Sequence, residues 1–374
     1  MIQAHAGGAG AREIGRTGFR LARCRQSFGA SRGIALATKN TLPGIDAFPD
    51  IARGLVDVEE ALTDTVLVAD PSISETTSYL LKAGGKRVRP ALVLLGSKFG
   101  DSIGESAIDA AVAVELIHLG SLYHDDVIDE SDTRRGLPSV NANWNNTIAI
   151  LAGDFLLSKA SEIGARLGRE ASELLARTLG DLVKGELREL TNAYNLESGL
   201  DDYWHVIENK TAALISASAR LGGMVGGTSQ QVTNDLAEYG FRIGIVFQIA
   251  DDLLDLVSTE EEIGKPPGID LVEGTYTLPV IHGLNGPNGD QLGKLLTPFT
   301  PAADGSRRNE IGDAELTEIR DLLRESGSIT YAMDQAREHL AAADQALARL
   351  PANPVRDALE AMGEFILARV PLPS

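Results

Sequence analysis

The amino-acid sequence predicts an all-α protein, on three observations. From about residue 50 onward, apolar residues recur every three to four positions, beginning with Ile51, Leu55, Val58 and Leu62. Segments that alternate between apolar and polar residues, as half-buried strands do, are scarce. Ala and Leu are abundant, whereas aromatic residues make up only 5% of the chain. We therefore expect a single all-α domain over residues 46–374, built from ten or more helices.

The helical spacing recurs in separate stretches after the first one. We expect these helices near residues 73–83, 87–99, 106–130, 147–166, 170–195, 201–222, 230–257, 276–284, 313–325, 329–348 and 353–370. Residues with turn chemistry separate them, at Gly84-Gly85, Gly136-Leu137-Pro138, residues 264–268 and Pro287-Asn288-Gly289. Residues 298–312, with Pro298, Pro301 and Gly305 among them, predict an exposed connection.

Length and composition restrict the class of protein. The chain has 374 residues, of which 43% are hydrophobic and 23% charged, which excludes a wholly disordered or collagen-like chain. Cys24 is the single cysteine, so no disulfide can form within the chain, and this fits a reducing compartment. No uninterrupted apolar run reaches the roughly 18 residues that a membrane-spanning helix needs.

The charge is strongly acidic and unevenly distributed. Lys and Arg number 34 and Asp and Glu 53, for a formal net charge of −19, which argues against general nucleic-acid binding because that needs a basic surface. The first forty residues differ, with seven basic residues and one acid, Glu13. Such a segment is typical of an organellar transit peptide, of a disordered tail, or of sequence upstream of the true start. We expect residues 1–45 to form a disordered basic extension outside the fold.

Two segments carry the same acidic pattern, Asp-Asp-x-x-Asp. Each stands at the C-terminal end of an apolar helical stretch. Residues four apart lie on one face of a helix, so the first and last aspartate of each pattern point together. These four candidate metal ligands are Asp125, Asp129, Asp251 and Asp255. The second aspartate of each pattern is turned by about 100° from that face, so we expect it to lie behind the site.

Two carboxylates one helical turn apart repel each other, and the C-terminal end of a helix is itself negative. A single pattern of this kind is often only a solvated helix end, but two copies on apolar helices predict a cation between them. An oxygen-only ligand set suits Mg²⁺, which keeps some of its waters and bridges to phosphates. The sequence therefore predicts a site for several Mg²⁺ ions and a polyanion such as a diphosphate.

A glycine-rich turn with three cations is a second candidate anion site. Gly84 and Gly85 precede Lys86, Arg87 and Arg89, and a helical stretch follows. Glycine lets the backbone approach a phosphate, and a helix N-terminus attracts anions. Arg offers bidentate contacts to phosphate oxygens, whereas Lys acts as a point charge. Further candidate cations are Arg134, Arg135, Lys210 and Lys265.

In this combination, the residues resemble the trans-isoprenyl diphosphate synthases, also called the polyprenyl synthetase family. The resemblance covers roughly residues 50–370, and six motifs in order carry it. They are Gly-Gly-Lys-Arg-x-Arg-Pro at 84–90, Glu-Leu-Ile-His at 115–118 leading into the first acidic pattern, Arg134-Arg135-Gly136, Lys210-Thr211, Phe247-Gln248 leading into the second acidic pattern, and Gly264-Lys265-Pro266. The resemblance implies an isoprenoid-synthase bundle of helices around a central apolar cavity.

The resemblance also implies a role for each matching residue. Lys86, Arg89, His118 and Arg135 would hold the diphosphate of isopentenyl diphosphate, and Arg134 would contact that of the allylic substrate. The four aspartates named above would bind Mg²⁺, with three ions present once substrate is bound. Lys210 and Lys265 would steady the leaving diphosphate, while Thr211 and Gln248 would line the region of the carbocation.

The implied reaction is the Mg²⁺-dependent head-to-tail condensation of isopentenyl diphosphate with an allylic diphosphate, farnesyl or geranylgeranyl. Cationic groups neutralise the diphosphate as it leaves, and the double bond of isopentenyl diphosphate attacks the allylic cation before one proton is lost. Water must be excluded because it would quench that cation. The released diphosphate is the base in this family, so no Ser-His-Asp or Cys-His constellation is needed.

Small residues before the first acidic pattern predict a long product. Gly120 and Ser121 stand where short-chain relatives carry bulky aromatic residues that close the cavity. Because cavity depth limits the length of a bound chain, we expect a product of about six to ten isoprene units, a precursor of quinone side chains in this family. Near Thr275, short-chain relatives often carry a second lysine, and its absence here also favours a long product. A geranylgeranyl product is the alternative if another helix supplies a floor, and close helix packing is the other explanation for Gly120.

Two other classes of protein share parts of this pattern. One is a terpene cyclase or head-to-head condensing enzyme on the same fold. Cyclases usually have a second motif with Asn, Ser and Glu, whereas this chain has a full acidic pattern, with Lys86 and Arg89 available for isopentenyl diphosphate. An inactive partner subunit of a heteromeric synthase tends to lose the aspartates, and this chain keeps all six. The resemblance further implies a homodimer. We expect a cytoplasmic protein with at most peripheral membrane contact, because a long product is apolar, or an organellar protein if residues 1–40 are a transit peptide. The acidic charge argues against a nucleic-acid partner.

Overall fold

The computed structural model describes residues 48–100, 103–259, 266–302, 306, 308 and 310–371. The chain divides into two units, residues 1–38 and 39–374, and all of the described residues belong to the second. The predicted basic extension over residues 1–45 lies outside the described residues, and so does Lys265.

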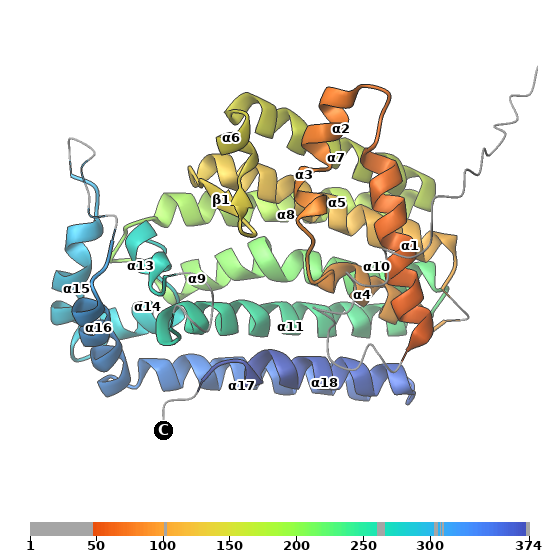
Figure 1. Cartoon of the computed structure of the whole chain (residues 1–374). Helices are drawn as coiled ribbons and strands as arrows, with labels where there is room; N and C mark the ends of the chain where they lie inside the picture. The colour runs from red at the N-terminus through yellow and green to blue at the C-terminus, as the bar shows by residue number, and fades with distance from the viewer. Residues whose placement is uncertain are drawn as a thin grey trace, which may run out of the picture. The chain divides into compact units, whose positions relative to one another are not determined.

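Almost all regular structure in this part of the chain is helical, as the sequence predicts (Figure 1). The first helices are α1 (Pro49–Val66), α2 (Pro71–Thr77), α3 (Tyr79–Lys82), α4 (Val88–Ser97), α5 (Glu105–Ile128), α6 (Val140–Asn143), α7 (Asn146–Leu167) and α8 (Arg169–Asn192). A continuous run follows, made of α9 (Leu200–Ile207), the π-helix η3 (Glu208–Ala212) and α10 (Ala213–Val225). The remaining helices are α11 (Gln230–Val257), α13 (Ile269–Glu273), α14 (Leu278–Leu284), α15 (Gly289–Leu296), the 3₁₀-helix η4 (Thr297–Phe299), α16 (Asp313–Glu325), α17 (Ser328–Ala348) and α18 (Pro354–Ala368).

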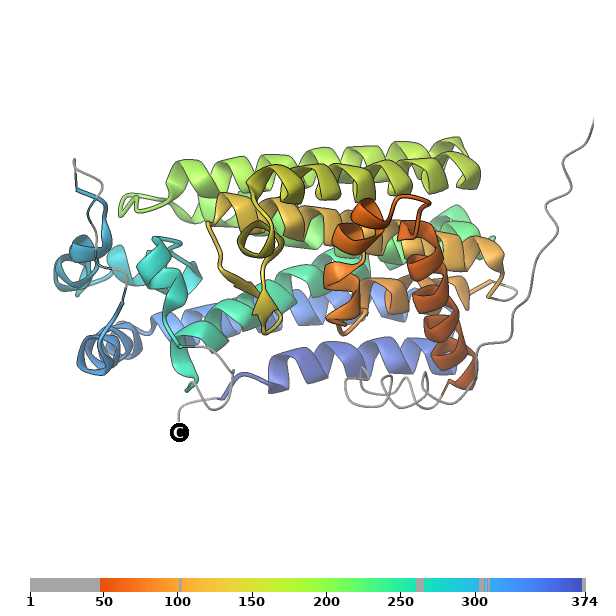
Figure 2. The same ribbon diagram turned by 45° about the horizontal axis from the view of Figure 1, so that its top comes forward.

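The helices of this unit pack in layers around α5, α10 and α11. Helix α5 contacts α1, α4, α7 and α10, while α11 contacts α10, α17 and α18. Figures 1 and 2 show α7 and α8 side by side on one side of α5, and α17 and α18 together along α11. Both acidic patterns therefore stand on central helices that neighbouring helices hold on several sides.

Helix α5 is both long and apolar. It is long and apolar enough in composition to cross a membrane, although the sequence has no uninterrupted apolar run of that length. Neighbouring helices bury 67% of its apolar window, however. The residues from Ala110 to Ile117 are all buried, as expected for a core helix with packing partners around it.

Side-chain caps mark the start of three of the long helices, α7, α11 and α18. The side chains of Asn145 and Asn353 accept hydrogen bonds of 3.0 Å and 2.9 Å from backbone N–H groups in the first turns of α7 and α18. Ser229 does the same for α11, with a bond of 3.3 Å to the backbone N–H of Val232. These side chains satisfy N–H groups that have no partner within the helix, so the helix begins at a defined residue.

Short elements differ from the predictions. The helix predicted over 73–83 is two helices divided at Ser78. Helices α6, α13 and α15 were not predicted, because helices this short do not show a helical period in the sequence. The predicted break at 136–138 belongs to a hairpin of β1 (Thr133–Arg134) and β2 (Leu137–Pro138), which pair antiparallel. The connection over 298–312 is not exposed throughout, because the ring of Phe299 is fully buried.

Candidate active site

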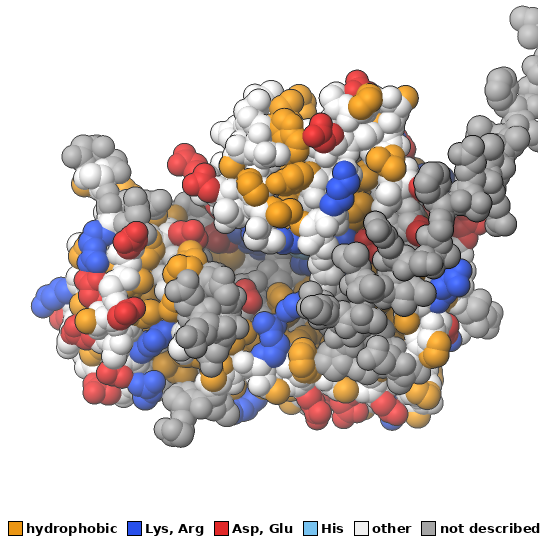
Figure 3. Space-filling view, viewed as in Figure 1, with side chains coloured by type: hydrophobic (Ala, Val, Ile, Leu, Met, Phe, Trp, Pro, Cys, Tyr) orange, Lys and Arg blue, Asp and Glu red, His pale blue; other side chains and the backbone are white. Residues whose placement is uncertain are grey.

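The two acidic patterns meet at one cavity of about 370 Å³. Asp129 at the end of α5 and Asp251 and Asp252 on α11 line it, together with Lys210 and Thr211 of η3. Figure 3 shows a hollow between the β1–β2 hairpin and α11, with acidic and basic side chains around it. The fold thus brings together two segments that are far apart in the sequence, as the repeated pattern predicts.

A second cavity of about 320 Å³ adjoins the first. Both are lined by Ile128, Glu186, Leu190, Lys210 and Thr211, so the two spaces meet at the π-helix. Five further apolar residues line the second cavity: Leu122, Leu182, Val183, Leu187 and Leu214. Its polar lining residues are Arg89, His118, Ser121, His124 and Asp125. A charged chamber therefore leads into a largely apolar one.

The first acidic pattern is short of positive charge. Burial raises the pKa of Asp125 to about 7, and the nearby carboxylates of Glu186 and Asp129 act in the same direction. Burial also raises the pKa of Asp129. Asp126 points away from both cavities and is fully buried, where it accepts a hydrogen bond of 2.6 Å from Nε of Arg134. A bound cation would relieve the repulsion between these carboxylates.

The second acidic pattern differs in part from the prediction. Asp251 and Asp252 line the charged cavity, whereas Asp255 does not. Asp255 is 4% exposed, and its carboxylate accepts a hydrogen bond of 3.2 Å from the backbone N–H of Asp270. Its carbonyl oxygen accepts another, of 2.9 Å, from Gly268. Asp255 therefore secures the start of α13, a tertiary contact that the helical period of α11 could not reveal.

Asp252 is the buried centre of a hydrogen-bond chain. Its carboxylate accepts a bond of 2.6 Å from the hydroxyl of Tyr203 and one of 2.8 Å from Nε2 of Gln248. The hydroxyl of Thr211 donates to Oε1 of the same Gln248 at 2.7 Å. Burial raises the pKa of Asp252 to about 7, against the effect of both donors. The predicted residues Thr211 and Gln248 are thus held in place by an aspartate that we expected to lie behind the site.

The donor set fits Mg²⁺ that is shared with a substrate. Among the described residues, no three His, Cys, Asp or Glu side chains converge as a finished metal site. Mg²⁺ characteristically binds through one or two protein carboxylates and completes its shell with water and phosphate oxygens. Asp125, Asp129 and Asp251 offer carboxylates from two facing helices, and the high pKa of Asp125 shows a site that favours a neutralising charge.

Lys210 is held by two acidic residues that the sequence analysis missed. Its ammonium group lies 2.7 Å from Glu186 and 2.7 Å from Glu189, both on α8. Burial alone would lower the pKa of Lys210, but Glu189 and Glu186 outweigh it, so the pKa is raised and the amine stays charged. The spacing of three residues between the two acids places them on one helical face, a signal that was available in the sequence.

Two neighbouring helices carry glycine where they pack against η3. A Cβ atom on Gly185 of α8 would lie 2.5 Å from the backbone nitrogen of Lys210. One on Gly244 of α11 would lie 2.6 Å from Cα of Ala212. The backbones of α8 and α11 therefore approach the π-helix closely, and π-helical turns are often found at functional sites.

The glycine-rich turn places a buried positive charge at the second cavity. Nε of Arg89 is buried and has no hydrogen-bond partner among the described residues, and burial lowers the pKa of this guanidinium. Burial, followed by the charge of Arg89, lowers the pKa of His118 well below its usual value, so the imidazole is neutral at pH 7. A buried guanidinium whose Nε has no hydrogen-bond partner among the described residues fits a diphosphate ligand. Lys86 stands on the turn, where partial loss of solvent and then Arg369 lower its pKa, against the effect of Asp251.

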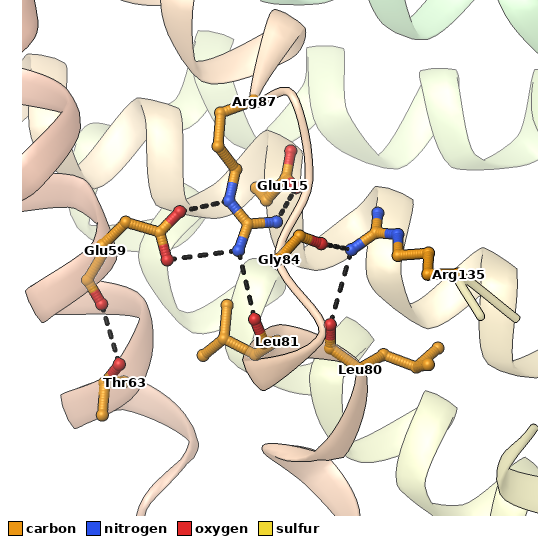
Figure 4. Close-up of polar contacts among 8 residues, drawn as sticks. All are labelled: Glu59, Thr63, Leu80, Leu81, Gly84, Arg87, Glu115 and Arg135. Atoms are coloured by element: carbon orange, nitrogen blue, oxygen red, sulfur yellow. Dashed lines mark hydrogen bonds and ion pairs between the residues drawn. The ribbon is translucent and has the colours of Figure 1, made fainter. Parts of the chain in front are cut away.

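Two predicted substrate ligands point elsewhere. Arg134 pairs with Asp126, and Arg135 donates to the carbonyl oxygens of Gly84 and Leu80, the latter at 3.4 Å (Figure 4). Neither arginine lines the two cavities. Arg135 and Gly136 both have positive φ, as a two-residue turn of the I′ type requires, and this turn directs Arg135 back toward Gly84. A diphosphate contact would therefore need these side chains to change partners.

The two predicted chain-length residues separate in the structure. Ser121 lines the second cavity, as expected for a residue beside a growing chain. Gly120 does not line it, which corrects the prediction. A Cβ atom on Gly120 would lie 3.0 Å from Leu157 and 3.2 Å from the carbonyl oxygen of Gly153, both on α7. Gly120 therefore allows α5 and α7 to pack closely, which is the other explanation that the sequence left open.

Comparison with known proteins places this geometry in a family. Residues 70–307 match the family model described as Polyprenyl synthetase. The chain is 40% identical over 322 residues to the nonaprenyl diphosphate synthase of Mycobacterium tuberculosis, covering 85% of this chain and 93% of that protein. It is 36% identical over 310 residues to heptaprenyl diphosphate synthase component 2 of Bacillus subtilis, covering 83% and 86%. The crystal structure of a decaprenyl diphosphate synthase from Rhodobacter capsulatus superposes with a TM-score of 0.80 at 32% identity, covering 88% of this chain and 100% of that one. The chain belongs to the polyprenyl synthetase family of trans-prenyltransferases, which make polyprenyl diphosphates.

Proposed function

We propose that this chain extends farnesyl or geranylgeranyl diphosphate with isopentenyl diphosphate to an all-trans product of about six to ten isoprene units, because an open apolar cavity sets the length of the chain that fits. The observation that carries the proposal is the junction of the two cavities at Lys210 and Thr211. A charged chamber between two acidic patterns suits a diphosphate, and the adjoining apolar chamber suits the hydrocarbon that grows from it.

Each of the predicted site residues has a separate role in this reaction. Mg²⁺, held by Asp125, Asp129 and Asp251 in up to three ions, would supply positive charge to the leaving diphosphate. Lys210, kept charged by Glu186 and Glu189, adds a fixed cation at the same place. Arg89 and His118 offer a buried guanidinium and a neutral imidazole to isopentenyl diphosphate. Lys265 lies outside the described residues and is proposed for the leaving group on the resemblance alone.

The walls of the second cavity support a product beyond geranylgeranyl. Its apolar lining comes from α8 and α10 as well as from α5, and Ser121 is the small residue that faces it from α5. The relatives named above are a nonaprenyl, a heptaprenyl and a decaprenyl synthase by description, which supports the same range.

Sizing the product tests the proposal. The purified protein is incubated with Mg²⁺, isopentenyl diphosphate and farnesyl diphosphate, and the dephosphorylated products are separated by length. The expected result is a ladder that ends at six units or more. A stop at four units would replace the long-chain proposal with a geranylgeranyl synthase, and no turnover with any allylic primer would favour a subunit that needs a partner.

We also propose that a second copy of this chain covers the outer faces of α7 and α8. Leu151 on α7 is 59% exposed, and Val183 and Leu187 on α8 are 51% and 57% exposed. Val183 and Leu187 also line the apolar cavity, so one wall of that cavity faces water until another surface covers it. A carbocation reaction needs that water excluded. One relative is described as a component of its synthase, so a different partner chain on this face is the alternative to a second copy.

We also propose a cytoplasmic location with at most peripheral membrane contact, because a polyprenyl product is apolar.

A further inference from the structure

Arg87 in the glycine-rich turn points into the protein and away from both cavities. Its guanidinium lies 2.7 Å from Glu115 of α5 and 3.1 Å from Glu59 of α1, with a second contact to Glu59 through Nε (Figure 4). We call these three residues the Arg87 triad. The side chains of Arg87 and Glu115 are 6% and 3% exposed, while that of Glu59 is 44% exposed. One arginine thus ties the turn to two separate helices through charged, partly bidentate contacts.

The backbone at Arg87 has an unusual conformation. Its φ of 50° is left-handed, which is uncommon for a residue with a side chain and persists where surrounding contacts hold it. Arg87 directly precedes α4, so this conformation sets the direction in which Val88 and Arg89 leave the turn. The triad contacts hold the side chain of this residue on two neighbouring helices.

Glu115 also balances the charge of the predicted isopentenyl diphosphate site. Three arginines surround this buried carboxylate, and it favours the charged form of each of them: Arg87, Arg89 and Arg135. The guanidinium groups of Arg87 and Arg135 both lie close to Gly85, where a Cβ atom would be 3.1 Å and 3.2 Å from their Nη1 atoms. Both arginines therefore hold the turn by contacts with its backbone or with neighbouring helices.

We propose that the Arg87 triad is a positioning device that fixes the Gly84–Arg89 turn in the shape that binds isopentenyl diphosphate. Arg87 acts through Lys86 and Arg89 and does not touch the substrate. This inference depends on the proposed placement of isopentenyl diphosphate at Arg89 and His118. It assigns a function to α1, whose Glu59 reaches the turn from outside the active site.

The test compares two acids of similar exposure on α1. Glu59→Gln removes one carboxylate of the triad, and its exposed position lets the variant fold. Asp57→Asn is the matched control, because Asp57 is 42% exposed and pairs with Arg53 at 3.1 Å on the surface. We expect Glu59→Gln to raise the KM for isopentenyl diphosphate about three- to tenfold, with kcat and the KM for the allylic substrate within about twofold of wild type. Asp57→Asn should leave all three values unchanged.

A second variant and a second measurement keep the test decisive. Arg87→Lys keeps the charge but loses the forked geometry, so it should raise the same KM by about tenfold or more. Hydrogen exchange of the amides at residues 85–89, measured without substrate, should be faster in Glu59→Gln than in wild type or Asp57→Asn. An equal rise in both KM values, or unchanged exchange, would overturn the inference. The exchange result does not depend on turnover, so an inactive wild type would contradict the proposed function while leaving this measurement decisive for the triad.

Discussion

At the scale of single residues, buried carboxylates destabilise the protein while no cation is bound, and the substrate complex can remove that destabilisation. Asp125 and Asp252 both have a pKa of about 7, and in both cases burial is the largest cause. Asp252 has two internal donors, Tyr203 and Gln248, whereas Asp125 faces Glu186 and Asp129 as well as Lys210. The two aspartates therefore have different expected roles. Asp252 orients its neighbours, and Asp125 is available to bind a cation.

This difference gives a prediction for the metal-free protein. Because the pKa of Asp125 is about 7 when folded and near 3.8 when unfolded, the folded state retains a proton that the unfolded state has lost between these values. The stability of the metal-free protein should therefore fall as the pH rises through this window and stay low above it. Asp125→Asn should raise Tm in EDTA at pH 8, by about 2–4 °C for each kcal/mol relieved, and by less at pH 5.

Thermal unfolding of wild type and variant at both pH values checks this prediction. Asp64→Asn, a change at an exposed residue of α1, is the control and should not change Tm. Addition of Mg²⁺ with diphosphate at pH 8 should stabilise wild type more than Asp125→Asn. An Asp125→Asn protein that is less stable than wild type at pH 8 would contradict the argument.

Adjacent residues on α5 should have separable effects. Ser121 faces the apolar cavity, so Ser121→Phe should fill part of it and shorten the product by at least one isoprene unit while Tm stays near that of wild type. Gly120→Ala places a Cβ against Leu157 and Gly153, so it should lower stability by about 1–3 kcal/mol without shortening the product. Product sizing and denaturant unfolding of both variants measure the two effects. A shorter product from Gly120→Ala at unchanged stability would return Gly120 to the cavity wall.

At the scale of elements, the π-helix depends on the helices beside it. Lys210 and Thr211 lie within η3, and Gly185 of α8 leaves room for the backbone of Lys210. Gly185→Ala should push this segment away, because a Cβ 2.5 Å from a backbone nitrogen cannot be accommodated without movement. We expect a loss of about a hundredfold in kcat, since displacement of about 1 Å at a reacting centre has that effect.

A matched control lies on the same helix. Gly180 is exposed, and a Cβ there would meet nothing within 4 Å, so Gly180→Ala should preserve activity and stabilise α8 by about 0.5–1 kcal/mol. Steady-state kinetics and thermal unfolding of the two variants provide the comparison. Equal kcat in wild type and Gly185→Ala would show that the position of η3 is not critical for the reaction.

Features that follow the helical period of the sequence were predictable, and features set by tertiary contacts were not. The helical period gave the long helices, the facing acidic patterns and the inward direction of Asp126. It could not show that Asp255 holds α13 or that Asp252 lines the charged cavity, because both depend on segments distant in the sequence. The same holds for Arg134 and Arg135. Their side chains donate hydrogen bonds to a carboxylate and to a carbonyl oxygen that the helical period does not identify.

At the scale of the whole molecule, one wall of the apolar cavity is exposed to solvent, so the proposed dimer would both cover this wall and keep water from the reaction. The side chains of Val183 and Leu187 both line that cavity and face solvent. Leu151 on the neighbouring helix α7 faces solvent as well but lines neither cavity, so a change there can disturb assembly without altering the cavity walls. This arrangement allows the proposed dimer to be tested apart from the active site.

We expect wild-type protein to be a dimer and Leu151→Glu to be a monomer with reduced turnover, because a charge at a buried interface position costs several kcal/mol of association. Phe365→Glu on α18 is the control, since Phe365 is 46% exposed on a helix that packs against α11 and α17. It should remain a dimer with normal activity. Light scattering after size-exclusion chromatography gives the mass of each species, and product sizing gives its activity. A wild-type monomer that makes the full-length product alone would refute the role of a second copy, and a wild-type monomer that is inactive alone would point to a different partner chain on the same face.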